Sequence, residues 1–143
     1  MGKAGDLLGA NIRAWNDHNE ASWIDQFSPD AMFRGPGGVS GSGTEMARTF
    51  YHLWQDAFPD NQVRIVRIVD GDDVAVLEAV FEGTQTDALN APAGSIPATG
   101  KRVAIPFVTL QDFANDRFTT FALYFDQMEL LTQLGLTPAT PTG

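Results

Sequence analysis

The chain has 143 residues, 43% of them hydrophobic, which predicts a single domain over residues 1–143 with a hydrophobic core. Its 18 acidic and 9 basic residues give a net charge of −9, which argues against nucleic acid and membranes as partners because both require a basic surface. Cysteine is absent, so disulfides and thiolate catalysis are excluded. No apolar stretch reaches the roughly 18 residues of a membrane span, and the N-terminus lacks a secretory h-region, so we expect a cytoplasmic protein.

The first part of the chain is predicted to be helical. Leu8, Ile12 and Trp15 recur at helical spacing and predict a helix over about residues 6–18. A second, short helix is expected over residues 21–27, because Ser28-Pro29-Asp30 breaks the pattern after it.

A short strand and a third helix follow. Residues 31–34 are typical of a strand, and the glycine-rich segment 35–38 predicts a loop. Ser42 and Glu45 have the spacing of a capping box, which predicts a helix with Ser42 as its N-cap. This helix carries a broad apolar stripe, and Pro59-Asp60 ends it.

The second half of the chain is predicted to form an antiparallel meander. Its strands are expected over residues 62–69, 74–86, 100–113 and 118–125. Residues 87–99 predict a loop that could cover the mouth of a cavity, and Pro106 indicates an edge or a bulge in the third of these strands. The tail, residues 137–143, is expected to be mobile.

The last strand ends on Asp126, which is placed to cap a short helix that starts directly after it. The order of all these elements predicts an α+β fold, with helices on one face of a curved antiparallel sheet that enclose an apolar cavity. A carboxylate delivered by an apolar strand could lie on the floor of that cavity. Burial of a carboxyl raises its pKa toward the working pH, which suits a general base.

Several segments resemble those of the SnoaL-like polyketide cyclases, which belong to the nuclear transport factor 2-like superfamily. They are Phe58-Pro59-Asp60, Gly83-Thr84, Pro97-Ala98-Thr99-Gly100-Lys101, and Tyr124-Phe125-Asp126-Gln127 followed by Leu130-Leu131-Thr132-Gln133-Leu134-Gly135. The resemblance covers nearly the whole chain. It implies a cystatin-like cone, a homodimer formed through the outer sheet face, and a cofactor-free cyclase or isomerase that acts on a hydrophobic, polyketide-like carbonyl compound.

The resemblance also suggests catalytic residues. In the family's cyclases an aspartate at the matching end of the last strand serves as acid and base, and Asp126 occupies that position. Tyr124 lies two residues earlier on the same face of the strand and could donate a hydrogen bond to an enolate oxygen. The alternatives are that Asp126 only caps the final helix and that Tyr124 is a core aromatic.

The ligand is expected to contact aromatic side chains and the two positions at which the chain departs from its relatives. Gln85 stands where many relatives carry histidine, and Ala122 where many carry tryptophan. We expect the cavity to be lined by Trp15, Trp54, Phe33, Phe58, Gln85, Phe107 and Ala122. His18 and His52 show no metal-binding spacing, so no metal site is predicted.

Two other functions stay open on the same fold. The first is a non-catalytic protein that binds a hydrophobic small molecule, and the second, less favoured, is an epoxide hydrolase, whose Arg-x-Asp pattern is missing from the sequence. An enzyme should hold Asp126 inside the cavity beside a polar partner. A binding protein should use Asp126 entirely as a helix cap.

Overall fold

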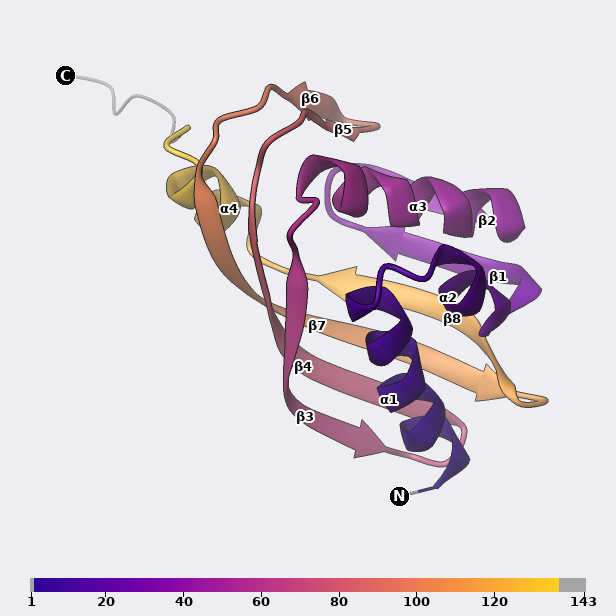
Figure 1. Ribbon diagram of the computed structural model, residues 1–143. Helices are drawn as coiled ribbons and strands as arrows, with labels where there is room; N and C mark the ends of the chain where they lie inside the picture. The colour runs from indigo at the N-terminus through magenta and orange to yellow at the C-terminus, as the bar shows by residue number, and fades with distance from the viewer. Residues whose placement is uncertain (1, 137–143) are drawn as a thin grey trace, which may run out of the picture.

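The computed structural model describes residues 2–136, in which helices cover the concave face of a curved sheet (Figure 1). The helices are α1 (Lys3–Asn16), α2 (Glu20–Asp25), α3 (Thr44–Ala57) and α4 (Gln127–Gln133). The main sheet contains β1 (Phe27–Gly35), β2 (Val39–Ser42), β3 (Gln62–Asp70), β4 (Val74–Thr84), β7 (Arg102–Ala114) and β8 (Arg117–Tyr124). A separate hairpin consists of β5 (Leu89–Ala91) and β6 (Gly94–Ile96). The predicted mobile tail, residues 137–143, lies outside the described residues.

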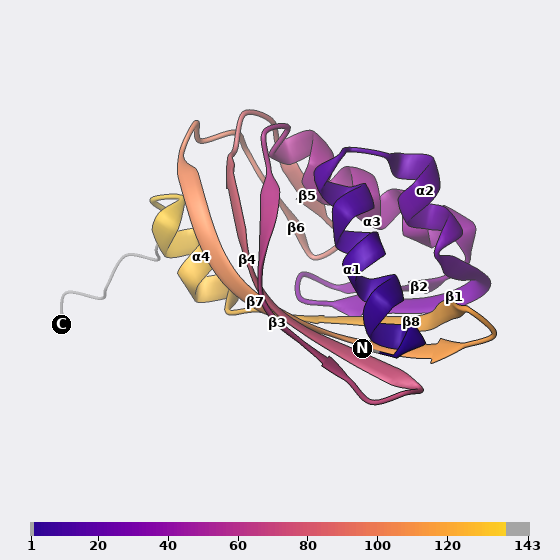
Figure 2. The same ribbon diagram turned by 60° about the horizontal axis from the view of Figure 1, so that its bottom comes forward.

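The strands of the main sheet follow the order β2-β1-β8-β7-β4-β3. Neighbours are antiparallel except for β1 and β8, which run parallel, with Phe33 beside Phe121. Figure 2 shows α1, α2 and α3 on the same side of this curved sheet. The predicted α+β architecture is therefore confirmed, and the sheet is mixed because β1, arriving from α2, runs alongside the last strand in the same direction.

The first strand and the start of α3 differ from the sequence prediction. The strand β1 begins at Phe27, four residues earlier than expected, and its register against β8 shifts between Phe27 and Met32. Pro29 lies within this irregularity, where a missing N–H costs no ladder bond. The capping box is wrong: Ser42 pairs with Met32 in the sheet, and Gly43, at φ 94°, is the N-cap of α3 without a side-chain hydrogen bond.

The core lies between the helices and the concave face. The helix α1 buries Leu8, Ile12 and Trp15, as its periodicity predicts. Along β4 buried residues alternate with partly exposed ones, so that Leu77 and Phe81 point to the helices. No helix within residues 2–136 has the length and apolar character that crossing a membrane requires.

Two of the segments that carry the family resemblance, Phe58-Pro59-Asp60 and Gly83-Thr84, meet beside the start of β3. Asp60 accepts a hydrogen bond from the backbone N–H of Thr84 at 2.7 Å, and this bond lowers the pKa of the Asp60 carboxyl. A Cβ at Gly83 would come within 3.1 Å of the Asn61 backbone, so only glycine fits here without a shift. These two segments therefore join the turn after α3 to the end of β4.

Candidate functional site

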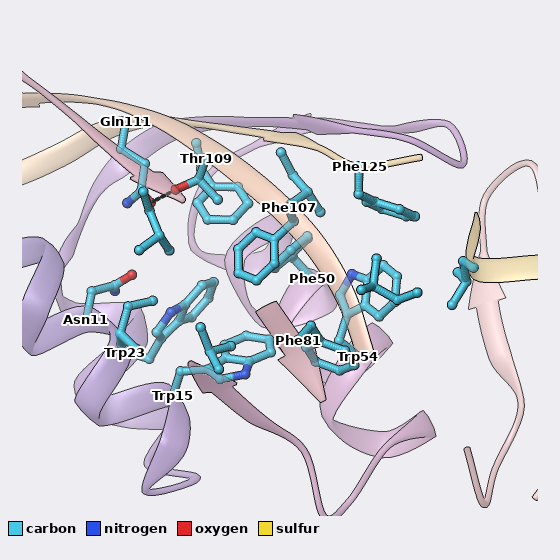
Figure 3. Close-up of a pocket in the computed structure, with 17 residues that line it drawn as sticks. Asn11, Trp15, Trp23, Phe50, Trp54, Phe81, Phe107, Thr109, Gln111 and Phe125 are labelled. Atoms are coloured by element: carbon cyan, nitrogen blue, oxygen red, sulfur yellow. Dashed lines mark hydrogen bonds between the residues drawn. The ribbon is translucent and has the colours of Figure 1, made fainter. Parts of the chain in front are cut away.

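A cavity of about 70 Å³ lies between the sheet and the helices (Figure 3). Each of the four helices contributes to its wall, and so do β3, β4, β7 and β8. The aromatic lining residues are Trp15, Trp23, Phe50, Trp54, Phe81, Phe107, Phe121 and Phe125. The aliphatic ones are Ile12, Val63, Leu77, Ile105, Leu123 and Leu130. The remaining lining residues, Asn11, Thr109 and Gln111, are polar but uncharged, so the lining contains no ionisable side chain.

The three polar residues gather at one end of the cavity, which we call the closed end. Asn11, Thr109 and Gln111 are 1%, 2% and 1% exposed, and Figure 3 shows them on the same side of the cavity. The Thr109 hydroxyl donates to Gln111 Oε1 at 2.8 Å, and Asn11 Nδ2 donates to Gln26 Oε1 at 2.8 Å. Gln111 Nε2 is buried and has no hydrogen-bond partner among residues 2–136.

The opposite end, which we call the mouth, is aromatic and half-buried. It is formed by Trp54, Phe107 and Phe125. The Trp54 and Phe125 rings meet edge to face with centroids 5.5 Å apart. Trp54 Nε1 has no hydrogen-bond partner within the described chain, whereas Trp15 Nε1 donates to Asn61 Oδ1 at 2.7 Å. The Trp15 ring is therefore fixed by a hydrogen bond, and the Trp54 ring is held by packing alone.

The helix α4 closes the cavity beside the mouth with Leu130. It is attached to β7 through the Gln133 carboxamide, which accepts from Ala104 N–H at 2.7 Å and donates to Ala104 C=O at 3.0 Å. Ala104 precedes Val108, which is the first residue of β7 that pairs with β8, opposite Tyr124. Pro106 lies in the same part of β7, which pairs with β4 on one side and does not pair with β8 on the other. This corresponds to the edge position expected for Pro106.

Asp126 does not lie on the cavity floor, so the expectation from the sequence is wrong on this point. Its side chain is exposed and accepts hydrogen bonds from the N–H groups of Met128 and Glu129, at 2.9 and 3.3 Å. Tyr124 is 51% exposed, and its hydroxyl accepts from Arg34 at 3.1 Å on the outer face of the sheet. The reason is the alternation of the strand: Phe121, Leu123 and Phe125 point into the cavity, so the residues between them point away.

The expected ligand-contacting residues divide into two groups. Trp15, Trp54 and Phe107 line the cavity, and the others do not. Phe33 is buried among aromatic rings of the core, 5.0 Å from Phe27 and 5.5 Å from Phe121 between centroids.

The other three expected contacts lie outside the cavity lining. Phe58 packs behind Phe81 at 5.2 Å, and Ala122 is buried on the opposite face of β8 from the cavity. Gln85 is fully buried in a structural role, because it accepts from the Thr99 hydroxyl at 2.7 Å and donates to Ile96 C=O at 3.2 Å. Gln85 therefore holds the end of β6 and the segment after it, up to Thr99, against the end of β4.

The sequence interpretation missed the closed end, although signals for it exist. Asn11 is three residues after Leu8 and four before Trp15, so it shares their helix face. Thr109 and Gln111 continue the period-two series of inward residues that starts at Ile105 and Phe107. A polar residue that falls in an apolar series is the signal that could have identified this end.

The sequence model of the SnoaL-like domain matches residues 10–121. Similar solved structures include TsrD from Streptomyces laurentii, 22% identical with a TM-score of 0.78, where the match covers 94% of this chain and 96% of that one. IdmH from Streptomyces antibioticus, a proposed polyketide cyclase, is 20% identical with a TM-score of 0.75 and coverages of 94% and 99%.

A third similar structure carries a bound small molecule. It is a protein with a ketosteroid isomerase-like fold from Catenulispora acidiphila in complex with trimethylamine, 22% identical with a TM-score of 0.75 and coverages of 94% and 97%. At these identities the likeness establishes the fold alone. No curated protein matches the chain significantly.

Proposed function

Because the chain belongs to the SnoaL-like domain family, we propose that it binds a small, neutral and mainly apolar molecule in the cavity between its helices and its sheet. The observation that carries this proposal is the lining, which is aromatic and aliphatic with a few uncharged polar groups at one end. Such a lining is typical of ligand pockets, where most of the surface is apolar and a few polar groups fix the orientation. A charged ligand would lose its hydration without gaining a counter-charge.

The size of the cavity limits how the ligand enters. At about 70 Å³ it is smaller than the roughly 150 Å³ of a cavity that holds benzene. A ring compound therefore requires the wall to move, and the Trp54 and Phe125 rings at the mouth are placed to do so, because they are half-buried and their contact involves no hydrogen bond. The Catenulispora protein is named as a complex with trimethylamine, a molecule smaller than benzene. Because an aliphatic amine is protonated at neutral pH, this comparison supports the small size of the ligand and not its neutrality.

Intrinsic fluorescence provides a direct test. The three tryptophans of the chain all line the cavity, so their emission should change when a ligand binds. We expect toluene, phenol or 2-naphthol to change the emission saturably and to raise the Tm. If none of them changes either property up to its solubility limit, the proposal is wrong.

The second candidate function is an acid–base cyclase or isomerase that uses Asp126 and Tyr124. It is favoured by the name of IdmH as a proposed polyketide cyclase, whereas the exposed positions of Asp126 and Tyr124 outside the cavity lining count against it. Asp126→Asn removes the acid but keeps an effective N-cap, so it separates chemistry from structure. If the wild-type protein converts a polyketide-like carbonyl compound and Asp126→Asn does so equally fast, Asp126 is not the proton shuttle.

We also propose that two copies pair through the outer face of the sheet. Met32, Val108, Leu110 and Tyr124 are 64%, 37%, 37% and 51% exposed there, and Val108 lies beside Tyr124 in the β7–β8 ladder. An apolar stripe of this kind suits a two-fold interface, in which the same surface faces itself. Light scattering should give the mass of a dimer, and a monomeric mass would contradict the proposal.

A further inference from the structure

The closed end of the cavity contains a polar group whose hydrogen-bonding capacity is not met by residues 2–136. Gln111 is 1% exposed, its Oε1 accepts from the Thr109 hydroxyl, and its Nε2 has no partner among residues 2–136. Buried amide groups are nearly always hydrogen-bonded, because leaving one unpaired costs its hydration energy. An unpaired donor in the wall of a cavity therefore indicates a partner that enters the cavity.

The neighbours of Gln111 keep this group at the closed end. Thr109 stands two residues earlier on the same face of β7, so its hydroxyl bonds one atom of the carboxamide and leaves the other. If the carboxamide is turned over, the oxygen becomes the unpaired atom, because the hydroxyl then accepts from the nitrogen. Asn11 lies at the same end on α1, where its Nδ2 is occupied by Gln26. The closed end thus presents an uncharged hydrogen-bonding group in either arrangement.

We propose that the closed end recognises a neutral oxygen substituent, a hydroxyl or a carbonyl, on an otherwise apolar ligand, with Gln111 as the residue that bonds it. This inference rests on the proposed binding function and adds to it the chemical class of the ligand. A carboxylate or phosphate in this place would be buried without a cation, since the lining has no ionisable group. A hydrocarbon of the same shape fits the walls but leaves Gln111 unpaired.

Phenol and toluene form a matched pair of probes, because they differ by a hydroxyl in place of a methyl group. Binding is measured by titration calorimetry and tryptophan emission on the full chain. We expect the wild-type protein to bind phenol roughly three- to tenfold more tightly than toluene, the range expected for a net buried hydrogen bond. A purely apolar cavity would instead favour toluene, the more hydrophobic of the two.

Gln111→Met keeps the length of the side chain and removes its hydrogen bonds. It should remove the preference for phenol and leave toluene binding intact. Thr109→Val, which frees the carboxamide to rotate, should reduce the preference partly, and it serves as the second variant if Gln111→Met does not fold. Gln62→Met makes the same change on the exposed side of β3, away from the cavity lining, and should leave both affinities unchanged.

The outcomes separate this inference from the proposed function. Loss of the phenol preference in Gln111→Met, with toluene still bound, supports the inference. Equal affinity of the wild-type protein for both probes, or a preference that persists in the folded Gln111 and Thr109 variants, overturns the inference while the binding function stands. Failure of both probes to bind the wild-type protein overturns the binding function and this inference with it.

Discussion

The two ends of the cavity are built on different physical terms. At the closed end Asn11, Thr109 and Gln111 are almost fully buried. Thr109 is hydrogen-bonded to Gln111, and Asn11 is hydrogen-bonded to Gln26. At the mouth Trp54, Phe107 and Phe125 are half-buried, and the Trp54–Phe125 contact is a ring edge against a ring face. Directional bonds fix geometry, whereas aromatic contacts at a surface permit rotation. Selectivity is therefore expected from the closed end and access from the mouth.

The strand β7 connects these ends, and its partners change along its length. Near Thr109 it is bonded on both sides, by β4 and β8. Near Ala104 it is bonded by β4 and by the Gln133 carboxamide of α4, which replaces the missing strand. The hydrogen bonds between α4 and β7 come from one side chain, whereas a sheet ladder has a series of backbone bonds, so we expect the mouth to be the less stable end.

The largest loss of stability is expected from a substitution near the closed end. Trp23 is 2% exposed and meets the Trp15 ring edge to face at 5.3 Å. Trp23→Ala should lower the free energy of unfolding by about 3–5 kcal/mol, because it leaves a large cavity in a packed region. Chemical denaturation followed by circular dichroism measures this loss. Trp23→Phe, the control, should lose much less, and equal losses in the two variants would show that the ring is not packed as described.

A matching substitution at the mouth should lower the free energy of unfolding by less and should change how fast a ligand enters the cavity. Phe125→Ala removes one ring of the Trp54–Phe125 contact, but the ring is half-buried, so we expect a loss of about 1–2 kcal/mol, below the value for a fully buried ring. The association rate of a ligand such as phenol should rise, as followed by stopped-flow tryptophan emission.

Phe113→Ala is the control for this change, since Phe113 is also half-buried but does not line the cavity. It should cost a similar amount of stability without changing the association rate. A rate that does not respond to Phe125→Ala would show that ligands enter elsewhere.

Removal of the N-cap of α4 should lower the free energy of unfolding by an intermediate amount. Asp126→Ala removes the acceptor for the N–H groups of Met128 and Glu129 and should cost about 1 kcal/mol, whereas Asp126→Asn should cost little, because asparagine caps as well. The loss should appear first as faster amide hydrogen exchange in α4 and next to the mouth. If Asp126→Asn destabilises α4 as much as Asp126→Ala does, the carboxylate charge contributes more than its hydrogen bonds.

Local patterns in the sequence predict most of the fold. The helical spacing of Leu8, Ile12 and Trp15, the alternation along β4 and the cap at Asp126 all correspond to the structure, because each depends on contacts within one element. The parallel pairing of β1 with β8 joins segments about ninety residues apart in sequence, as Phe33 and Phe121 show. Such a pairing is set by tertiary packing, which no local pattern contains.

The site is less predictable for a related reason. Alternation divides the last strand into Phe121, Leu123 and Phe125 on one face and Ala122 and Tyr124 on the other, but it does not say which face the helices cover. The sequence interpretation placed the ligand on the face of Tyr124, and the cavity lies on the face of Phe121. The polar residues that matter for binding are uncharged and interrupt apolar series, so a search for acids and bases passes over them.

The smallest effect on stability is expected from a link between α2 and α3, which both contribute to the cavity wall. His52 on α3 lies 2.7 Å from Glu20 on α2 through Nε2 and 3.1 Å from Asp56 through Nδ1. The helix α2 carries Trp23, and α3 carries Trp54. The hydrogen bond to Asp56, followed by that to Glu20, raises the pKa of His52 above its ordinary value.

A raised pKa means that the fold favours the charged imidazolium. The resulting stability is fully present below the unfolded-state pKa, near 6.5, and it is lost as the pH rises through the higher folded-state value. All the groups are partly exposed and Arg48 also approaches Glu20, so we expect less than about 1 kcal/mol. His52→Gln should therefore be less stable than the wild-type protein at about pH 5.5 and nearly equal to it at about pH 8.5, as measured by urea unfolding at both values. A difference that is the same at both values of pH would mean that His52 joins α2 to α3 by packing, and that its charge does not take part.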